Sequence, residues 1–288
     1  MTKIQRNIVK IFVANLAVCL AACGGPSAST IGAESAVGAP DEQIASSKFA
    51  EILCANPEFP LLAVETNYQG ILQRNPDEGG LNDHAAGVAR DGLTGWLNDI
   101  RTFIESDEFK DGILANQSNR DILERLYLGY LKRPLDTTGA KIFLRLMNEK
   151  GVLVTARALA TSDEYFNKIF PFASIDRDRH SRIVTKIYQA MLGRAPSAAE
   201  TELSANDFGD RGLRGVYDAI ERISGTEEHA RAIAQAAGAV AGRYFSALLG
   251  RAPTADESKR AVDLIGKKDH ARAAFEIAAG REFLDKTP

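Results

Sequence analysis

The pentapeptide Leu-Gly-Arg-Ala-Pro occurs twice in this chain, at residues 192–196 and again at 249–253. The stretches around it, "IYQAMLGRAPSAAE" and "YFSALLGRAPTADE", are also alike, and weaker versions, "NYQGILQRNPDEGG" and "LYLGYLKRPLDTTG", lie upstream. Self-similarity at a regular interval indicates a repeat architecture, in which each copy is one unit of local structure. Aligned on the arginine, the four copies follow one another at intervals of 59, 61 and 57 residues. Four related segments are therefore expected to fill the body of the protein.

The residues around each arginine recur in register. An aromatic residue stands six positions before the arginine, a leucine stands two positions before it, and a Ser-x-Glu-Phe-like motif ends 35 or 32 positions after it. The arginines are Arg74, Arg133, Arg194 and Arg251, the aromatics are Tyr68, Tyr127, Tyr188 and Phe245, and the end motifs are "SDEF" at 106–109, "SDEY" at 162–165, "TEEH" at 226–229 and "GREF" at 280–283. We place segment 1, with an additional N-terminal helix, at 46–116, segment 2 at 117–175, segment 3 at 176–232 and segment 4 at 233–288.

Each segment is predicted to fold into three helices. In the first helix the aromatic residue and the leucine share one face, the arginine suits the C-terminus, and the following proline cannot continue the helix. A glycine-containing turn separates the second helix from the third, which runs into the end motif. Abundant alanine, leucine and isoleucine with only 7% aromatic residues also favour helices. The predicted fold class is all-α, with four degenerate three-helix repeats packed into one or two helical bodies.

The start of each second helix carries an N-cap signal. In segments 3 and 4 the signal is a capping box, in which Ser197 or Thr254 is followed three residues later by a glutamate. In segments 1 and 2 the corresponding residues, Asp77 and Asp136, are predicted to cap the helix alone. Because two chemical solutions occupy one position, we interpret that position as structural.

The arginine of each segment is predicted to pair with the glutamate of its own end motif. A planar guanidinium can donate two parallel hydrogen bonds to one carboxylate, which would join the first helix to the third. The alternative is that the arginines bind an anionic glycan or a phosphate; their recurrence in step with the turns favours the structural interpretation. The predicted pairs are Arg74 with Glu108, Arg133 with Glu164, Arg194 with Glu228, and Arg251 with Glu282.

The N-terminus predicts export and lipid attachment. Residues 1–22 join a short basic segment to the apolar run "IFVANLAVCLAA", too short to span a bilayer, and so resemble a secretory signal peptide. Leu-Ala-Ala before Cys23 resembles the lipobox of bacterial lipoproteins, in which the signal is cut before the cysteine and fatty acyl chains are added; an ordinary signal peptide is the alternative. Gly24 after it resembles the pattern for sorting to an outer membrane. Residues 23–45, rich in Gly, Ser, Ala and Pro, are expected to form a flexible tether.

The repeated pattern resembles the bacterial family called domain of unknown function 4214. The family consensus runs Tyr…Leu-Gly-Arg-x-Pro-Asp-x-x-Gly and then Ser-x-Glu-Phe, and the resemblance covers about residues 60–285 as four degenerate copies. Segments 1 and 2 keep the Asp and a Gly, segments 3 and 4 lack them, and His229 replaces the terminal aromatic of segment 3. The resemblance implies a helical fold similar to that of phycobilisome linker polypeptides. Members are common in surface-layer, calcium-repeat and polysaccharide-related envelope proteins, which implies scaffolding or binding rather than catalysis.

The sequence contains no motif that indicates another class of function. The net charge is −3, and residues 1–22 hold three of the 35 basic residues and no acidic one, so 32 bases face 38 acids in the remainder. An acidic body lacks the basic footprint of a nucleic-acid-binding protein. There is no HExxH, GxSxG, GxxxxGKS/T or GxGxxG motif, and the histidines, His84, His180, His229 and His270, include no pair at metal-ligand spacing on one helix. No catalytic residue, metal site or cofactor is predicted, and Cys54 and Trp96 are interpreted as core residues.

The sequence thus favours a non-enzymatic lipoprotein of the bacterial cell envelope. It would be held to the membrane, with the outer membrane favoured, through a lipid on Cys23 and would display a helical binding or scaffold surface for another envelope protein or a glycan. One alternative is a glycan-acting enzyme with a carboxylate site in a cleft between segments; another is a structural component of a surface layer. An enzyme would need one segment to carry acid or base residues that the others lack, converging in a pocket. A scaffold would instead show exposed apolar patches.

Overall fold

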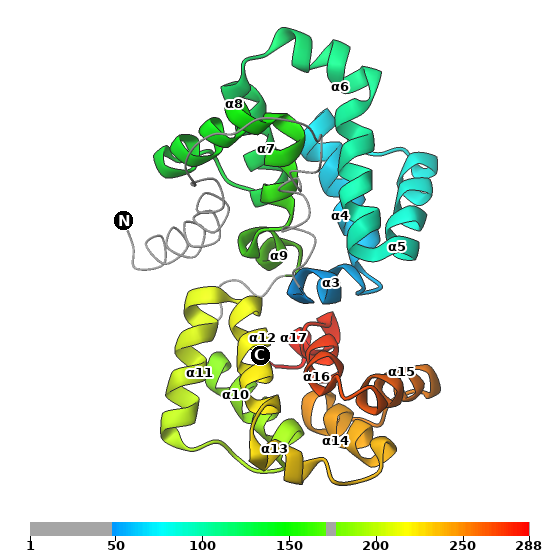
Figure 1. The fold of residues 1–288 in the computed structure, drawn as a ribbon, viewed down its shortest axis with the longest axis vertical. Coiled ribbons are helices and arrows are strands. Elements are labelled where there is room, and N and C mark those ends of the chain that lie inside the picture. The colour runs from blue at the N-terminus through cyan, green and yellow to red at the C-terminus, as the bar shows by residue number, and fades with distance from the viewer. Residues whose placement is uncertain (1–47, 171–176, 288) are drawn as a thin grey trace, which may run out of the picture. The chain divides into compact units, whose positions relative to one another are not determined.

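The computed structural model describes residues 48–170 and 177–287, and every regular element in these ranges is a helix (Figure 1). The all-α fold class is confirmed, since the described residues contain no strand. The predicted signal peptide, Cys23 and the predicted tether lie outside the described residues. The four segments are described below in chain order.

Segments 1 and 2 contain long second helices that bend at a glycine. In α5 and α8 the bend lies at Gly92 (φ 57°) and Gly151 (φ 85°), where the sequence predicts a turn between two helices. The elements of segment 1 are α3 (Lys48–Cys54), α4 (Phe59–Asn67), the π-helical turn η1 (Tyr68–Leu72), α5 (Glu78–Glu105), α6 (Asp107–Gly112) and the 3₁₀ turn η2 (Leu114–Asn116). Those of segment 2 are α7 (Asn119–Leu131), α8 (Thr137–Ala160) and α9 (Asp163–Ile169).

Segments 3 and 4 have the same order of elements with shorter helices. Gly212 (φ 59°) ends one helix and begins the next in segment 3, whereas in segment 4 the turn residue with positive φ is Lys268 (φ 63°) and not Gly266. The elements of segment 3 are α10 (Arg177–Leu192), α11 (Ala198–Arg211), α12 (Leu213–Ser224) and α13 (Glu227–Ala232). Those of segment 4 are α14 (Ala237–Leu249), α15 (Ala255–Gly266), α16 (His270–Ala278) and α17 (Arg281–Asp285).

The end motif corrects the prediction of three helices per segment. It was expected to lie in the third helix, but it begins a short helix of its own: α6, α9, α13 and α17. In three segments the side chain of the first motif residue, Ser106, Ser162 or Thr226, accepts a hydrogen bond from the backbone N–H three residues later. This N-cap holds the backbone of that residue in an extended conformation, so the preceding helix ends there. Gly280 of segment 4 has the same extended conformation without a side-chain cap.

The backbone conformation explains the glycine of the repeated Leu-Gly-Arg-Ala-Pro. Gly193 and Gly250 follow the last residue of α10 and α14 with φ of 73° and 69°, in the left-handed region that glycine adopts without steric cost. The residues at the same position in segments 1 and 2, Gln73 and Lys132, have φ of 55° and 52°. All four first helices therefore end in the same left-handed turn, which points the next residue, the arginine, toward the end motif.

The first helices pack in pairs, η1 on α7 and α10 on α14. Gly70 and Gly129, both four positions before the arginine, lie in contact where η1 meets α7. A Cβ added to Gly129 would lie 1.9 Å from the Cα of Gly70, so a side chain there would force the two elements apart. At the same position α10 carries the buried Ala190.

Helix α3 contributes an aromatic ring to the core. Phe49 contacts Phe166 of segment 2, Tyr217 of segment 3 and Phe275 of segment 4, with ring centroids 5.6–5.8 Å apart. Trp96 is fully buried and stacks on Tyr165, so its interpretation as a core residue is confirmed. Cys54 is also buried, as predicted, and burial raises the pKa of its thiol well above the ordinary value, which keeps it protonated and unreactive.

Candidate functional site

The structure joins each predicted arginine to its predicted glutamate. In all four segments the guanidinium donates from Nε and Nη2 to the two carboxylate oxygens, at 2.5–3.0 Å. This two-bond geometry is the one that favours arginine over lysine. The first helix of each segment is thereby tied to the short helix that begins at the end motif.

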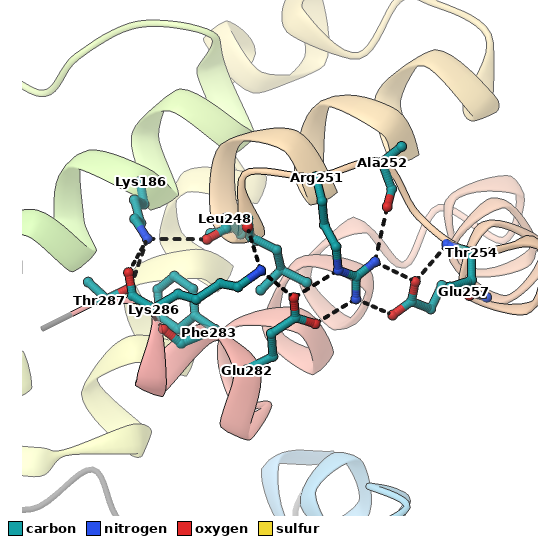
Figure 2. A network of polar contacts seen from close by, with 11 residues as sticks. Lys186, Leu248, Arg251, Ala252, Thr254, Glu257, Glu282, Phe283, Lys286 and Thr287 are labelled. Atoms are coloured by element: carbon teal, nitrogen blue, oxygen red, sulfur yellow. Dashed lines mark hydrogen bonds and ion pairs between the residues drawn. The ribbon is translucent and has the colours of Figure 1, made fainter.

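A second carboxylate, from the N-cap or the first turn of the second helix, lies beside each arginine. In segment 4 Arg251 lies between Glu282 and Glu257, and it donates two bonds to Glu257 at 2.7 and 2.8 Å (Figure 2). Arg194 of segment 3 binds Glu200 in the same way, at 2.8 and 2.9 Å. In segment 2 the single cap Asp136 accepts one bond of 2.6 Å, and in segment 1 the cap Asp77 lies 3.9 Å from the guanidinium.

The repeated aromatic residue lies beneath the guanidinium in every cluster. The guanidinium carbon is 4.7–5.7 Å from the ring centroids of Tyr68, Tyr127, Tyr188 and Phe245, within the range of a cation–π interaction. Each arginine also donates from Nη1 to the backbone carbonyl of the next residue, at 3.0–3.4 Å. Because these donors are already used within the protein, the geometry supports a structural role over anion binding.

Hydrogen bonding keeps the cluster carboxylates ionised. Bonds from Arg194 lower the pKa of Glu200 to about 2, and bonds from Arg251 lower the pKa values of Glu257 and Glu282 to about 2. In segment 4, Lys286 adds a bond of 2.7 Å to Glu282 (Figure 2). A second lysine in that view, Lys186, donates to Leu248 O, Lys286 O and the Thr287 hydroxyl, which ties the end of the described chain to α10.

The four predicted helix caps are present. Asp77, Asp136, Ser197 and Thr254 each accept a hydrogen bond from the backbone N–H three residues on. The two capping boxes are complete, because Glu200 and Glu257 also accept from the backbone N–H of the cap residue. The same two glutamates bind the arginines, so one side chain serves both the cap and the arginine cluster.

Three polar residues that the sequence analysis did not connect meet between segments 3 and 4. The Nε2 atom of His229 lies 3.2 Å from the Tyr244 hydroxyl, which lies 3.4 Å from Nδ1 of His270. His229 is 1% exposed, Tyr244 is fully buried and His270 is 8% exposed. We call these three residues the His-Tyr-His cluster.

The hydrogen bonds of the His-Tyr-His cluster determine which of its atoms carry a proton. Nδ1 of His229 lies 3.2 Å from the Ser224 carbonyl, which only accepts, so Nδ1 carries the proton and Nε2 accepts from Tyr244. The tyrosine has one proton to give, so its oxygen accepts from Nδ1 of His270. Burial lowers the pKa of His229 to about 4 and also lowers that of His270. Both rings are therefore neutral at neutral pH.

The same three register positions are apolar in the other pair of segments. Where segments 3 and 4 have His229, Tyr244 and His270, segments 1 and 2 have Phe109, Leu126 and Val152. The positions are the last residue of the end motif, the seventh residue before the arginine, and the nineteenth residue after it. Comparison of the copies at these positions is the sequence signal that could have found the cluster.

A cavity of about 610 Å³ lies against the His-Tyr-His cluster. His229 and His270 form part of its wall, and Lys48, Glu221, Lys268 and Asp269 supply two positive and two negative charges. Lys48 and Asp269 pair with each other at 3.0 Å. Glu221 accepts a hydrogen bond from the Tyr217 hydroxyl, and Lys268 forms no ion pair within residues 48–170 and 177–287. This is a pocket with a mixed polar and apolar wall that no motif in the sequence predicts.

A second polar cluster lies between segments 1 and 2 and is closed by its own hydrogen bonds. Asp99 accepts from Asn67 at 2.8 Å and lies 2.5 Å from Nδ1 of His84, while the Tyr130 hydroxyl donates to Asn67 at 2.6 Å. The bond to Asp99 raises the pKa of His84, so this histidine becomes charged more easily than the buried pair in segments 3 and 4.

Few large hydrophobic side chains of the described residues are exposed. The exposed large hydrophobic residues are Leu61, Leu114, Leu128 and Leu203, on four different elements. Among the described residues, no group of three or more His, Cys, Asp or Glu side chains could hold a metal ion. No helix that the structure describes has the length and apolar character needed to cross a membrane.

The chain matches no family model and no curated protein. The resemblance to the domain of unknown function 4214 family therefore rests on the residues quoted for it.

Proposed function

We propose that this protein is a lipid-anchored envelope lipoprotein whose helical body binds another envelope component through the pocket beside the His-Tyr-His cluster. The lipobox-like residues before Cys23 support the anchor. The resemblance to the domain of unknown function 4214 family, common in envelope proteins, supports the compartment. In this proposal the four arginine clusters are structural, and the pocket is the binding element.

The observation that carries the binding role is the replacement of three apolar positions by His229, Tyr244 and His270. Buried polar side chains cost free energy unless they are paired, and segments 1 and 2 use apolar residues at the same positions. The polar set is thus not needed to build the fold. Its position beneath a charged cavity supports a role in binding.

A second candidate, a glycan-acting enzyme, is favoured by the same convergence of titratable residues at a pocket. Its acid or base would be Glu221 or Asp269, the two carboxylates of the wall. Asp269, however, pairs with Lys48 and caps α16, and Glu221 accepts from Tyr217. Both carboxylates are therefore held by the protein, which supports binding over catalysis.

The anchor is tested by substitution of Cys23. Cys23→Ser should move the protein from the membrane fraction to the soluble fraction and abolish labelling by an alkyne-bearing palmitate. A serine variant that still sediments with membranes and still takes up the label would refute the anchor.

The binding role is tested by photo-cross-linking in intact cells. A photoreactive residue at Ala230, an exposed residue of the pocket wall, should give a defined adduct that mass spectrometry identifies as protein, glycan or small molecule. The matched control is Leu203, which is 53% exposed on α11 and outside the wall. Equal labelling at the two positions, or none at Ala230, would contradict the proposal.

A further inference from the structure

The turn residue Lys268 is an exception among the four segments. The other three turns between second and third helices use glycine with positive φ, at Gly92, Gly151 and Gly212. Lys268 has φ of 63°, a conformation that is strained for a residue with a side chain. Gln73 and Lys132 adopt a similar φ at the ends of their helices, and what distinguishes Lys268 is that it also lies in the pocket wall.

The charges of the wall define what the pocket would accept. Lys48 and Asp269 neutralise each other, and both histidines are neutral, which leaves the ammonium of Lys268 and the carboxylate of Glu221 as the charges without an opposite partner in the described residues. A ligand with a single charge would meet one of these groups with repulsion or leave it unpaired. A ligand with one charge of each sign satisfies both.

The pocket wall also has an apolar part. Ile233, Ala230 and Ala271 line the pocket together with the charged residues, and the cavity has room for more than one small residue. An aliphatic side chain could lie against them while charged ends meet the rim. Ligand sites commonly combine an apolar wall with a few placed polar groups in this way.

We propose that the pocket binds a small zwitterion, an amino acid or a short peptide, whose carboxylate pairs with Lys268 and whose ammonium pairs with Glu221. This inference rests on the proposed binding function and names its ligand class. Free amino acids and peptides share the chemistry, and their separate titration distinguishes the two sources.

The test is calorimetric titration of the mature lipoprotein in detergent micelles with leucine and with the dipeptide Leu-Leu. N-acetylleucine lacks the ammonium and leucinamide lacks the carboxylate, so each should bind about tenfold more weakly than leucine. Glucose serves as the uncharged polar control. A zwitterion that binds no better than these three compounds would overturn the ligand class.

Two variants separate recognition from folding. Lys268→Gly removes the ammonium group and relieves the strain of a positive φ, so it should keep or raise the melting temperature while it weakens zwitterion binding about tenfold or more. Glu221→Gln should weaken binding similarly, and Lys267→Ala, a neighbour paired with Asp263 outside the wall, should leave it unchanged. Unaltered binding in Lys268→Gly would overturn the proposal, whereas an adduct at Ala230 without zwitterion binding would leave the binding function standing.

Discussion

Segments 1 and 2 and segments 3 and 4 use the same arginine clusters but differ at three positions counted from the arginine or in the end motif. Phe109, Leu126 and Val152 in the first pair correspond to His229, Tyr244 and His270 in the second. Because the arginine, its glutamate, its aromatic and its left-handed turn recur in both pairs, the clusters belong to the fold. The three polar residues belong to one pair alone, beside the pocket. The arginine clusters are therefore common to all four segments, whereas the three polar residues are specific to segments 3 and 4.

The largest test of this comparison exchanges the residues between the pairs. Phe109→His places an imidazole at a position that is 1% exposed and whose corresponding neighbours in register, Leu126 and Val152, offer no hydrogen-bonding side chain. Loss of packing and an unpaired polar ring should lower the free energy of unfolding by about 3 kcal/mol. Urea denaturation followed by circular dichroism measures the change.

The reciprocal exchange, His229→Phe, should be mild. It removes two hydrogen bonds but restores the residue type of the other segments, and Tyr244 can still donate to His270. A loss below about 1 kcal/mol is expected. If His229→Phe destabilises the protein as much as Phe109→His, the polar cluster is part of the fold and the comparison fails.

The arginine clusters should rank by burial and by the number of carboxylates. Arg133→Ala and Arg251→Ala each remove bonds to two carboxylates and a cation–π contact, from side chains 32% and 30% exposed, and should cost about 2 kcal/mol. Arg74 is 42% exposed and its second carboxylate lies 3.9 Å away, so Arg74→Ala should cost less than about 1 kcal/mol. Melting temperatures of the three variants give the order, and equal shifts would argue against it.

The recurrence in sequence was sufficient to predict the clusters and the fold class. Four copies of one pattern sample the same geometry four times, so the pairing of Arg133 with Glu164 could be inferred from spacing and charge alone. The all-α class followed from helical periodicity with cap and turn residues. The prediction of an end motif inside the third helix is wrong because Ser106 and Ser162 each cap a separate short helix, a position that serine favours.

The pocket could not be predicted because it depends on departures from the pattern. Tyr244 and His270 fit an amphipathic helix as well as the apolar residues they replace, and only the packing of α13, α14 and α16 brings them to His229. Likewise, the sequence pattern predicts no more for Glu221 and Lys268 than exposed charged side chains. Charge and periodicity describe one helix at a time, whereas the pocket wall comes from several.

Histidines in the two pairs of segments should make opposite contributions to the pH dependence of the free energy of unfolding. The pKa of His229 is about 4 in the folded protein against 6.5 for an ordinary histidine, so the unfolded chain binds the proton first as pH falls. Stability should therefore drop between pH 6.5 and about 4, by about 1–2 kcal/mol. Denaturation at pH 6.5 and 5.5, above the unfolded-state pKa of ordinary carboxyl groups, tests this, and the His229→Phe variant should lose less stability between the two.

His84 provides the opposing contribution from segment 1. Its pKa is raised by the bond to Asp99, so its stabilisation is present below pH 6.5 and is lost as pH rises through the raised value. His84→Gln should flatten stability above pH 6.5 without altering the drop on the acid side. A change on the acid side instead would show that the two histidine sites are not independent.

The smallest expected effect concerns the residue before each arginine, where glycine ends the first helix in segments 3 and 4 and a larger residue does so in segments 1 and 2. Gly193→Ala places a Cβ at φ of 73° and should cost about 1 kcal/mol. Gln73→Gly relieves the same strain at φ of 55° but gives the unfolded chain more freedom, so a gain of only about 0.5 kcal/mol is expected. Opposite signs of these two changes in denaturation experiments would show that one left-handed turn serves both pairs. A loss of stability in Gln73→Gly would mean that the glutamine side chain contributes more than its strained backbone removes.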